Sequence, residues 1–331
     1  MPRSRIIPVF VPHAGCPHQC VFCDQRQITG ADAPITPQAL TALLAEATAR
    51  SGPGAELAFY GGSFTAVAPA LQEALLAAAQ PFLAGGQLGG IRCSTRPDAL
   101  GPEALTRLRR WGVGTVELGC QSMDDAVLRA SGRGHTAADT VQAVQRLRAG
   151  GFRVVTQMMT GLPGDTPAGA LATARALAAL APDGARIYPT LVLPHTPLAA
   201  MYARSAYRPQ TLDEAVDCCA ALWEVFRAAG IPVLRVGLHD TSELAASALA
   251  GPYHPAFGEL VLSRMFLRRA QALLGPARGA PQATLRVATQ RVSQMTGQHR
   301  ANLRALEAEF SIGALRVRPA ALDPWEVTVE Y

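Results

Sequence analysis

Short apolar runs alternate with longer Ala- and Leu-rich stretches over roughly the first 240 residues of this 331-residue chain. Seven runs have the length and composition of strands: Ile6–Pro12, Glu56–Tyr60, Ile91–Ser94, Thr115–Leu118, Arg153–Met158, Arg186–Val192 and Val233–Val236. The stretches between them suit amphipathic helices: Pro37–Arg50, Pro69–Leu83, Pro102–Trp111, Thr136–Ala149, Thr166–Leu180 and Leu212–Ala229. This alternation is typical of βαβ units with a parallel sheet. The sequence therefore predicts an α/β fold, either an open doubly wound sheet or a complete or partial (β/α) barrel.

Polar or glycine-rich motifs follow five successive strands of this prediction. They are Gly61-Gly62-Ser63-Phe64, Ser94-Thr95-Arg96-Pro97-Asp98, Gly119-Cys120-Gln121-Ser122, the run from Gln157 to Gly164, and Pro194-His195-Thr196-Pro197. Parallel barrels build their active sites at the carboxyl ends of the strands. We therefore expect one site at a barrel mouth. No Gly-x-Gly-x-x-Gly motif follows the first strand, which argues against a dinucleotide-binding Rossmann fold.

Three cysteines follow the first predicted strand with the spacing Cys-x3-Cys-x2-Cys: Cys16, Cys20 and Cys23. Three thiolates in one loop can bind three irons of a cubane cluster and leave the fourth iron without a protein ligand. An open iron can take the amino and carboxylate groups of S-adenosylmethionine (SAM), whose reductive cleavage releases a 5′-deoxyadenosyl radical. We therefore expect these three cysteines to be the metal ligands and the centre of catalysis.

A zinc site is the alternative for this loop, with His13 or His18 as a fourth ligand. The second Cys pair of a zinc ribbon is missing. The other four cysteines are scattered and are expected in the core: Cys93, Cys120, Cys218 and Cys219. Seven cysteines form an odd set, which argues against a disulfide framework.

All 30 basic residues are arginine, so a lysine Schiff base and a P-loop lysine are excluded. Ten of these arginines lie between Arg264 and Arg318, where the acidic residues are Glu307 and Glu309. A basic C-terminal region suits a polyanionic partner, and RNA is the partner that we expect; a solvated helical face is the alternative.

The strand pattern weakens after Val236. We expect a helix over Ala256–Leu274 and then a strand–helix–strand–strand unit with the ranges Thr284–Ala288, Gly297–Glu309, Leu315–Arg318 and Glu326–Tyr331. The predicted domains are therefore a core of residues 1–240 and an α+β extension of residues 241–331. The sequence has no uncharged apolar run of membrane-spanning length and no signal-peptide cleavage site, so we expect a cytoplasmic protein that binds no membrane.

Several of these motifs together resemble the radical SAM superfamily. The cysteine loop carries Phe22 before its last cysteine, and Gly61-Gly62 resembles that superfamily's Gly-Gly-Glu motif with Ser63 in place of the glutamate. Longer strings resemble the branch that contains the catalytic subunit of the Elongator complex: Tyr60 to Thr65, Ser94 to Asp98, Glu117 to Ser122, Ser131 to Thr136 and Gly161 to Gly164. Oxygen-independent coproporphyrinogen oxidases share parts of these strings.

The resemblance covers about residues 5–240 and implies a partial (β/α)6 barrel, one 4Fe-4S cluster and SAM. It also implies an electron donor such as a flavodoxin or ferredoxin, and tRNA or another RNA as the substrate. No Gln-x-x-Gly-x-Gly/Ala acetyl-CoA loop follows residue 240, so we expect a short bacterial relative without an acetyltransferase domain. The rival functions are a zinc-stabilised nucleic-acid-binding module, an electron-transfer or sensing protein, and a radical SAM enzyme acting on a small metabolite such as a tetrapyrrole.

The resemblance also implies cofactor-binding roles at the barrel mouth. The backbone of Gly61 and Gly62 would meet the SAM amino group, next to Phe22 and Ser63. Arg96 suits the SAM carboxylate, with an ion pair to Asp98 as the alternative.

Gln121 and Gln157 suit the SAM ribose or the substrate, with a structural hydrogen-bond network as the alternative. Gly161 and Leu162 would bring backbone near the adenine, with a simple turn as the alternative.

Two further residues have open roles. Strand alternation predicts that Glu117 points into the barrel, to orient a ligand, to accept a proton, or to form a salt bridge with an inward arginine. His195 is a weaker candidate for substrate contact.

Overall fold

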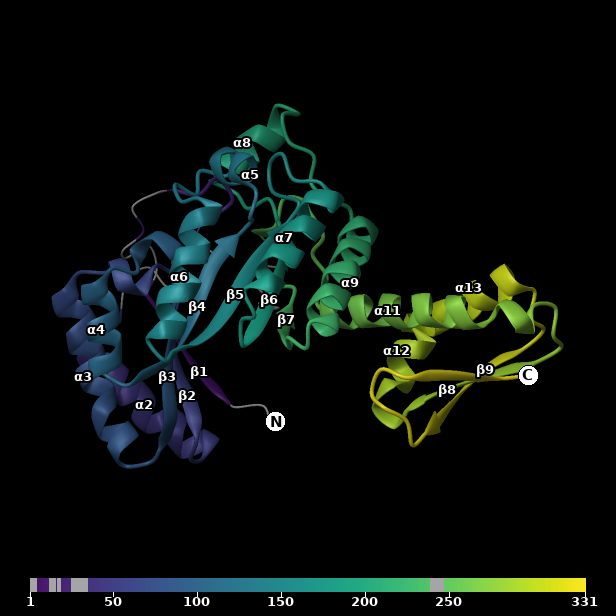
Figure 1. The fold of residues 1–331 in the computed structure, drawn as a ribbon, viewed down its shortest axis with the longest axis horizontal. Helices are drawn as coiled ribbons and strands as arrows, with labels where there is room; N and C mark the ends of the chain where they lie inside the picture. The colour runs from purple at the N-terminus through teal and green to yellow at the C-terminus, as the bar shows by residue number, and fades with distance from the viewer. Residues whose placement is uncertain (1–4, 12–15, 17–18, 25–34, 239–246) are drawn as a thin grey trace.

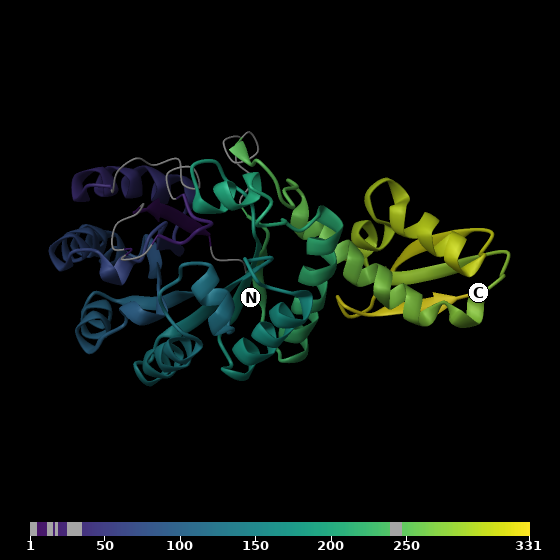
Figure 2. The same ribbon diagram turned by 90° about the horizontal axis from the view of Figure 1, so that it is seen from above.

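The structure is a computed structural model that describes residues 5–11, 16, 19–24, 35–238 and 247–331. His13 and His18, the alternative zinc ligands, lie outside these residues. Seven strands form one parallel sheet in which each strand pairs with the next along the chain. The strands are β1 (Ile6–Phe10), β2 (Ala55–Tyr60), β3 (Leu88–Thr95), β4 (Val113–Gln121), β5 (Arg153–Thr160), β6 (Gly184–Pro189) and β7 (Val233–Val236). The partial-barrel prediction is confirmed: the sheet curls into an open half-barrel (Figures 1 and 2).

Helices cross between consecutive strands and cover the convex face of the sheet (Figure 2). The main ones are α2 (Pro37–Ser51), α3 (Pro69–Ala84), α4 (Pro102–Arg110), α6 (Ala137–Ala149), α7 (Pro167–Ala179) and α9 (Leu212–Ala228), and each begins and ends close to its predicted range. Two short helices, α5 (Asp125–Ala130) and α8 (Pro197–Ala203), follow β4 and β6 and were not predicted. The side chains of Thr36, Thr136, Thr166 and Thr211 accept hydrogen bonds from the first turns of their helices, as N-caps do.

The two faces of the sheet have opposite chemistry. Leu57, Val116 and Ile187 point toward the helices and are 0% exposed in the hydrophobic core. The alternate residues point to the inner, concave face, which we call the lumen. Several of them are charged, which is unusual for strands buried in a parallel sheet.

Strand β1 is an edge of the half-barrel, and its central residue is Pro8. The Arg5 carbonyl accepts from Glu56, and the Val11 amide donates to Tyr60, so the odd-numbered residues of β1 bond to β2. The position of Pro8 therefore faces the open edge, where its missing N–H costs no hydrogen bond and hinders pairing with another chain.

The C-terminal part forms a second, smaller body (Figure 1). Strands β8 (Ala283–Ala288), β9 (Leu315–Ala320) and β10 (Val327–Glu330) form a sheet in the order β10–β8–β9, which packs with α12 (Val292–Thr296) and α13 (Ala301–Phe310). The predicted order of a strand, a helix and two further strands is confirmed, and the short helix α12 is an addition that was not predicted. Helix α13 begins later than predicted, because His299 and Arg300 have positive φ angles of 50° and 62° and cannot be helical.

Helix α11 (Phe257–Leu273) joins the two bodies (Figure 2). Phe257 and Met265 belong to the barrel core, whereas Phe266 and Ala270 belong to the second core. Trp325, from the loop before β10, contributes to both cores, with its ring stacked on Phe266 at 6.1 Å between centroids. The two bodies are therefore packed together through side chains as well as joined by the chain. No helix of the described residues is long and apolar enough to span a membrane.

Candidate active site at the barrel mouth

The cysteine loop is fixed by hydrogen bonds to two other connections at the mouth. The Val21 amide donates to the Ser131 carbonyl at 3.1 Å, and the Val21 carbonyl accepts from the Leu198 amide at 2.8 Å. Arg133 Nη1 lies 3.2 Å from Cys20 Sγ, and its Nη2 donates to the Gly119 carbonyl at 2.5 Å. The loop after β1 is thus attached to the end of β4, to the turn before α6 and to the start of α8.

The thiol of Cys16 lies beside the turn that follows β2. Burial raises the pKa of the Cys16 thiol, and the backbone N–H of Ser63 and the guanidiniums of Arg96 and Arg133 act in the opposite direction. Cys20 is close enough to Cys16 to raise the pKa further. The first loop and the Gly61-Gly62 turn therefore meet, as a shared site requires.

The donor chemistry of the loop fits an iron–sulfur cluster. Cys16, Cys20 and Cys23 form no disulfide among the described residues, and the Cys20 side chain is buried. Thiolates are the metal-binding form, and they accept hydrogen bonds of the kind that Ser63 and Arg133 offer. Among the described residues no three His, Cys, Asp or Glu side chains are grouped as one metal ion would need. A cubane places each thiolate on a different iron, so its ligands need not meet at one point.

The turn after β2 uses the Ser63 side chain internally. Ser63 is 1% exposed, its hydroxyl lies 2.8 Å from Thr95 Oγ1, and it accepts the Arg96 backbone N–H at 3.2 Å. Gly61 has φ +100°, a conformation that favours glycine, and both Gly61 and Gly62 are partly exposed. What this turn offers a ligand is therefore its backbone, because the serine ties β2 to β3.

Arg96 forms the ion pair with Asp98 that was the alternative to a cofactor contact, and the pair is largely buried. Its Nε and Nη2 each lie 2.9 Å from an Asp98 oxygen, and Nη2 also donates to the Arg133 carbonyl. The guanidinium lowers the pKa of Asp98 against the raising effect of burial. Arg96 Nη1 is buried without a hydrogen-bond partner among the described residues, so one donor edge remains available.

Gln121 ends β4 in a conformation that is rare for a residue with a side chain. Its φ is +65°, and its Oε1 is buried without a partner in the described structure. Backbone strain of this kind costs about 1–3 kcal/mol and tends to occur at functional sites. The unpaired oxygen lies at the mouth, on the strand whose end carries the Gly119 carbonyl bonded to Arg133.

Glu117 points into the lumen, as predicted, and forms salt bridges with inward arginines. Its Oε1 accepts from Tyr60 Oη at 2.8 Å and from Arg92 Nη1 and Arg186 Nη2 at 3.0 Å. Its Oε2 accepts from Gln157 Nε2 at 2.9 Å. Burial raises the pKa of Glu117, but Arg186, Tyr60 and Arg92 outweigh it and the pKa is lowered.

Gln157 therefore belongs to this lumen network, and it lies inside β5, which continues to Thr160. The prediction that the polar run from Gln157 follows its strand is wrong for its first residues, because the ladder with β6 continues to the Thr160–Pro189 pair. The alternative given for Gln157, a structural hydrogen-bond network, is the arrangement that the structure shows. A role at the SAM ribose stays a prediction for Gln121.

The remaining predicted residues lie at the ends of β5 and β6 and in the cysteine loop after β1. Gly161 has φ +71°, and its carbonyl accepts from Tyr207 Oη at 2.6 Å, while the Leu162 side chain is 2% exposed. Phe22 is partly exposed in the cysteine loop, and His195 is exposed with φ +60°. Gly161 and Leu162 therefore form a backbone turn at the barrel mouth, after the end of β5.

Sequence reasoning gave no role to Arg133, Arg92 or Arg186. Arg133 lies in a string quoted above for its resemblance, but only the fold brings it to Cys20. Arg92 and Arg186 left a signal in the sequence, because each is a lone charge inside an otherwise apolar strand. Strand alternation predicts the inner face for both, as it does for Glu117.

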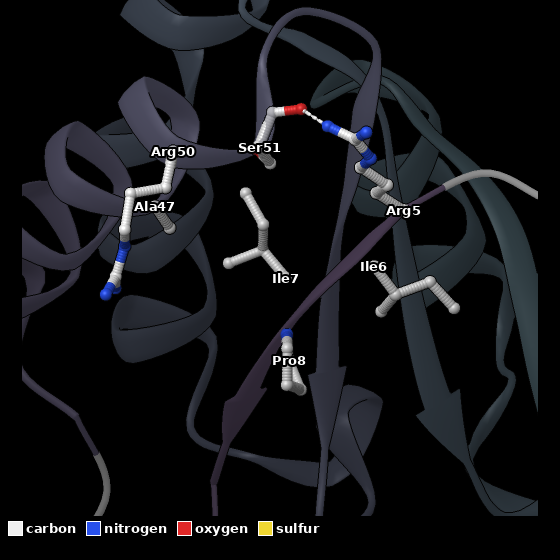
Figure 3. A pocket seen from close by; sticks show the side chains of 7 residues that line it. All are labelled: Arg5, Ile6, Ile7, Pro8, Ala47, Arg50 and Ser51. Atoms are coloured by element: carbon white, nitrogen blue, oxygen red, sulfur yellow. Dashed lines mark hydrogen bonds between the residues drawn. The ribbon is translucent and has the colours of Figure 1, made fainter.

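A separate pocket of about 490 Å³ lies at the start of β1, lined by Arg5 to Pro8, Ala47, Arg50 and Ser51 (Figure 3). In it the Arg5 guanidinium donates to the Ser51 carbonyl. The cysteine loop follows the other end of β1, so this pocket is not part of the mouth.

Comparison with known proteins gives the family. A tRNA uridine(34) acetyltransferase from Dehalococcoides mccartyi is 36% identical over 123 residues, which cover 36% of this chain and 27% of that protein. An uncharacterized protein from Methanocaldococcus jannaschii is 31% identical over 214 residues, 60% of this chain and 65% of that one. The chain thus spans only about a quarter of the acetyltransferase that it matches.

The solved structure of archaeal Elp3 from Methanocaldococcus infernus shares the fold, with a TM-score of 0.64 at 22% identity over 83% of this chain and 67% of that chain. The model of the radical SAM C-terminal domain matches residues 182–266. The model of the radical SAM superfamily matches residues 10–177, about half of the chain. The protein is therefore an enzyme that belongs to the radical SAM superfamily.

Proposed function

We propose that this chain holds a 4Fe-4S cluster on Cys16, Cys20 and Cys23 and cleaves SAM reductively to a 5′-deoxyadenosyl radical. The observation that carries the proposal is the attachment of the thiol loop to the barrel mouth, where Arg133 Nη1 lies 3.2 Å from Cys20 Sγ and the Val21 amide donates to the Ser131 carbonyl. When bound, such a cluster supplies one electron to the carbon–sulfur bond of SAM. A low-potential donor such as a flavodoxin or ferredoxin would replace that electron.

The groups of the chain that would bind SAM are the ones left without partners at the mouth. Buried polar atoms are almost always hydrogen-bonded, so the unpaired Arg96 Nη1 and Gln121 Oε1 indicate a ligand. The arginine suits a carboxylate and the amide oxygen suits a ribose hydroxyl. The exposed backbone of Gly61 and Gly62 suits the amino group, and the Gly161-Leu162 turn suits the adenine edge.

Arg133 would hold the cluster loop in place. Its guanidinium joins Cys20 Sγ to the Gly119 carbonyl, and both contacts are buried. A buried guanidinium also offsets part of the negative charge of thiolate ligands. Arg133 is thus a positioning residue that connects the end of β4 with the cysteine loop.

We further propose an RNA base, in tRNA, as the substrate. The support is the similarity to the D. mccartyi protein, which is named a tRNA uridine(34) acetyltransferase, together with the arginine-rich C-terminal body. Ion pairs reduce the number of arginines that remain available to RNA. Arg264 and Arg268 pair with Asp217 on α9, and Arg269 pairs with Glu224 on the same helix. Arg286 pairs with Glu330. Four exposed arginines keep no partner among the described residues and are available to phosphates: Arg300, Arg304, Arg316 and Arg318.

The test is anaerobic reconstitution with iron and sulfide, followed by measurement of bound metal and of 5′-deoxyadenosine with and without bulk tRNA. The wild type should bind iron and release 5′-deoxyadenosine from SAM. Cys16→Ser, Cys20→Ser and Cys23→Ser should each lose both. Cys218→Ser, the same substitution in a buried cysteine of α9, should keep both.

The outcomes separate the rival functions. A protein that takes zinc and no iron would be the zinc-stabilised module, and one that binds iron but leaves SAM intact would be an electron-transfer protein. Stimulation of 5′-deoxyadenosine release by tRNA supports the RNA substrate. Turnover that tRNA does not change would remove the RNA proposal and leave the cofactor proposal standing.

A further inference from the structure

Among the described residues, five charged side chains from five strands face the lumen together, and we call them the lumen cluster. Its members are Glu56, Arg92, Glu117, Arg186 and Arg235. Three cations face two carboxylates, so the lumen cluster has one positive charge that its own members do not balance. Where that charge resides decides what the lumen can bind.

Two of the arginines are neutralised. Arg92 forms salt bridges with Glu56 and with Glu117 Oε1, the latter at 3.0 Å. Arg186 Nε lies 2.8 Å from Glu117 Oε2. The side chains of Arg92, Arg186 and Glu117 are 7%, 9% and 1% exposed, so these pairs are largely buried.

The third arginine has no carboxylate partner among the described residues. Arg235 Nε and Nη2 donate to the carbonyls of Gly237 and Leu238 at 3.0 and 2.9 Å. Burial lowers the pKa of Arg235, and the neighbouring Arg186 lowers it further, while Tyr188 and Tyr60 raise it. Arg235 is partly exposed, so a ligand in the lumen can reach it.

A bulge in β7 turns Arg235 inward. Val233 pairs with Ala185, but Arg235 pairs with Arg186, so β7 holds one extra residue, Leu234, between the two pairs. Leu234 lies over Gly184, where its Cδ1 would be 2.9 Å from a Cβ on that glycine. Without the extra residue, alternation would direct Arg235 away from the lumen. Bulges that re-aim one side chain are common next to active sites.

The result is two guanidiniums opposite each other on neighbouring strands. Like charges at such positions are destabilising, and a partly buried charge without a counter-charge adds to the cost. An oxyanion between them removes both penalties. Guanidiniums form bidentate hydrogen bonds with carboxylate and phosphate oxygens. The Tyr188 phenol, beside Arg186 and Arg235, adds a further hydrogen-bond donor.

We propose that Arg235, with Tyr188 and Arg186, binds an oxyanion group of the substrate in the lumen. For the RNA substrate proposed above, that group is the phosphate next to the modified base. The choice of phosphate rests on the proposed function, whereas the oxyanion site itself does not. A small-metabolite substrate would place a carboxylate there instead.

The test is equilibrium binding by calorimetry to the reconstituted full chain, with uridine 5′-monophosphate, uridine, inorganic phosphate and acetate as probes. The wild type should bind uridine 5′-monophosphate more tightly than uridine. Arg235→Gln should weaken binding of the monophosphate by about tenfold or more, the loss of a charged hydrogen-bonding partner, and should leave uridine unchanged. The affinity of Arg235→Lys for the monophosphate should lie between those of the wild type and Arg235→Gln, because lysine keeps the charge but lacks the planar guanidinium.

Arg175→Gln is the matched control, because Arg175 is exposed on α7, outside the lumen. Equal affinity of the wild type for uridine 5′-monophosphate and uridine would overturn the inference, as would full affinity in Arg235→Gln. If Arg235→Gln does not fold, the inference is still tested by the affinity of Arg235→Lys and by the wild-type affinities for uridine 5′-monophosphate and uridine. Phosphate bound more tightly than acetate supports a nucleotide substrate, and the reverse supports a carboxylate substrate. None of these measurements requires SAM cleavage, so a failure of the proposed function would be seen separately.

Discussion

Replacing Glu117 by glutamine should destabilise the barrel strongly. The substitution keeps the shape of the side chain but removes the carboxylate that, among the described residues, is the only one bonded to Arg186, whose side chain is 9% exposed. Glu117 also accepts hydrogen bonds from Tyr60, Arg92 and Gln157. Removing one partner of a buried ion pair costs about 3–5 kcal/mol, because the other charge stays buried and uncompensated. For a barrel of this size that corresponds to a fall in Tm of roughly 6–20 °C.

The assay is calorimetric unfolding of the wild type, Glu117→Gln and a control, Glu46→Gln. Glu46 pairs with Arg50 on the surface of α2, where the side chains are 70% and 74% exposed, so solvent screens the pair. We expect no measurable change in Tm for the control. An equal, small shift in both variants would refute the claim that the lumen charges are held in a low-dielectric interior.

The pH dependence of the unfolding free energy gives a second test of the role of Glu117. The pKa of Glu117 is lowered in the folded state from an ordinary value of 4.5. Its stabilisation is therefore complete above that ordinary value and is lost as the pH falls through the lower, folded-state pKa. The stability difference between wild type and Glu117→Gln should be full at pH 7 and should shrink below about pH 4.5. A difference that does not change with pH would contradict this assignment.

Two further predictions concern the joint between the bodies and a buried histidine. Trp325→Ala should lower the free energy of unfolding by about 2 kcal/mol, less than for a fully buried tryptophan, because the ring contacts Phe266 and Trp223. It should also speed proteolysis of the C-terminal body. The control Tyr331→Ala, at a residue 71% exposed, should change neither the stability nor the rate of proteolysis. His135 has its pKa lowered to about 4 by burial and by Arg133 and Arg96, so the folded state excludes a proton that the unfolded state binds. Stability should therefore fall by up to about 1.4 kcal/mol per pH unit as the pH drops from about 6.5 to about 4, and urea titrations of His135→Gln should lack this slope.

Local sequence patterns were sufficient for the barrel strands, the main helices between them and their order, but not for the short helices α5 and α8. Periodicity and N-terminal threonines and prolines fix helices such as α6 and α9, because capping and amphipathic spacing act within a few residues. The end of β6 was predicted too late. The strand ends at Pro189, and Val192 pairs instead with Ala250 in an isolated antiparallel bridge, a contact with a distant part of the chain that no local pattern contains.

The roles of the charged residues depended on contacts across the sheet. The sequence indicated an inward Glu117 but not its partners, and it counted ten C-terminal arginines without showing that three of them bind α9. Charge counts in a sequence overestimate the surface charge for this reason, because ion pairs between distant segments consume part of it.

By itself the sequence determined the α/β order, the three-cysteine loop and the polar motifs that follow successive strands, because each is a pattern of neighbouring residues. The tertiary structure alone decided that the Cys16 thiol meets the Ser63 amide, that Arg133 reaches Cys20, and that a bulge turns Arg235 toward Arg186. These are contacts between strands and loops many residues apart. Their geometry depends on the curl and register of the whole sheet, which no short stretch of sequence specifies.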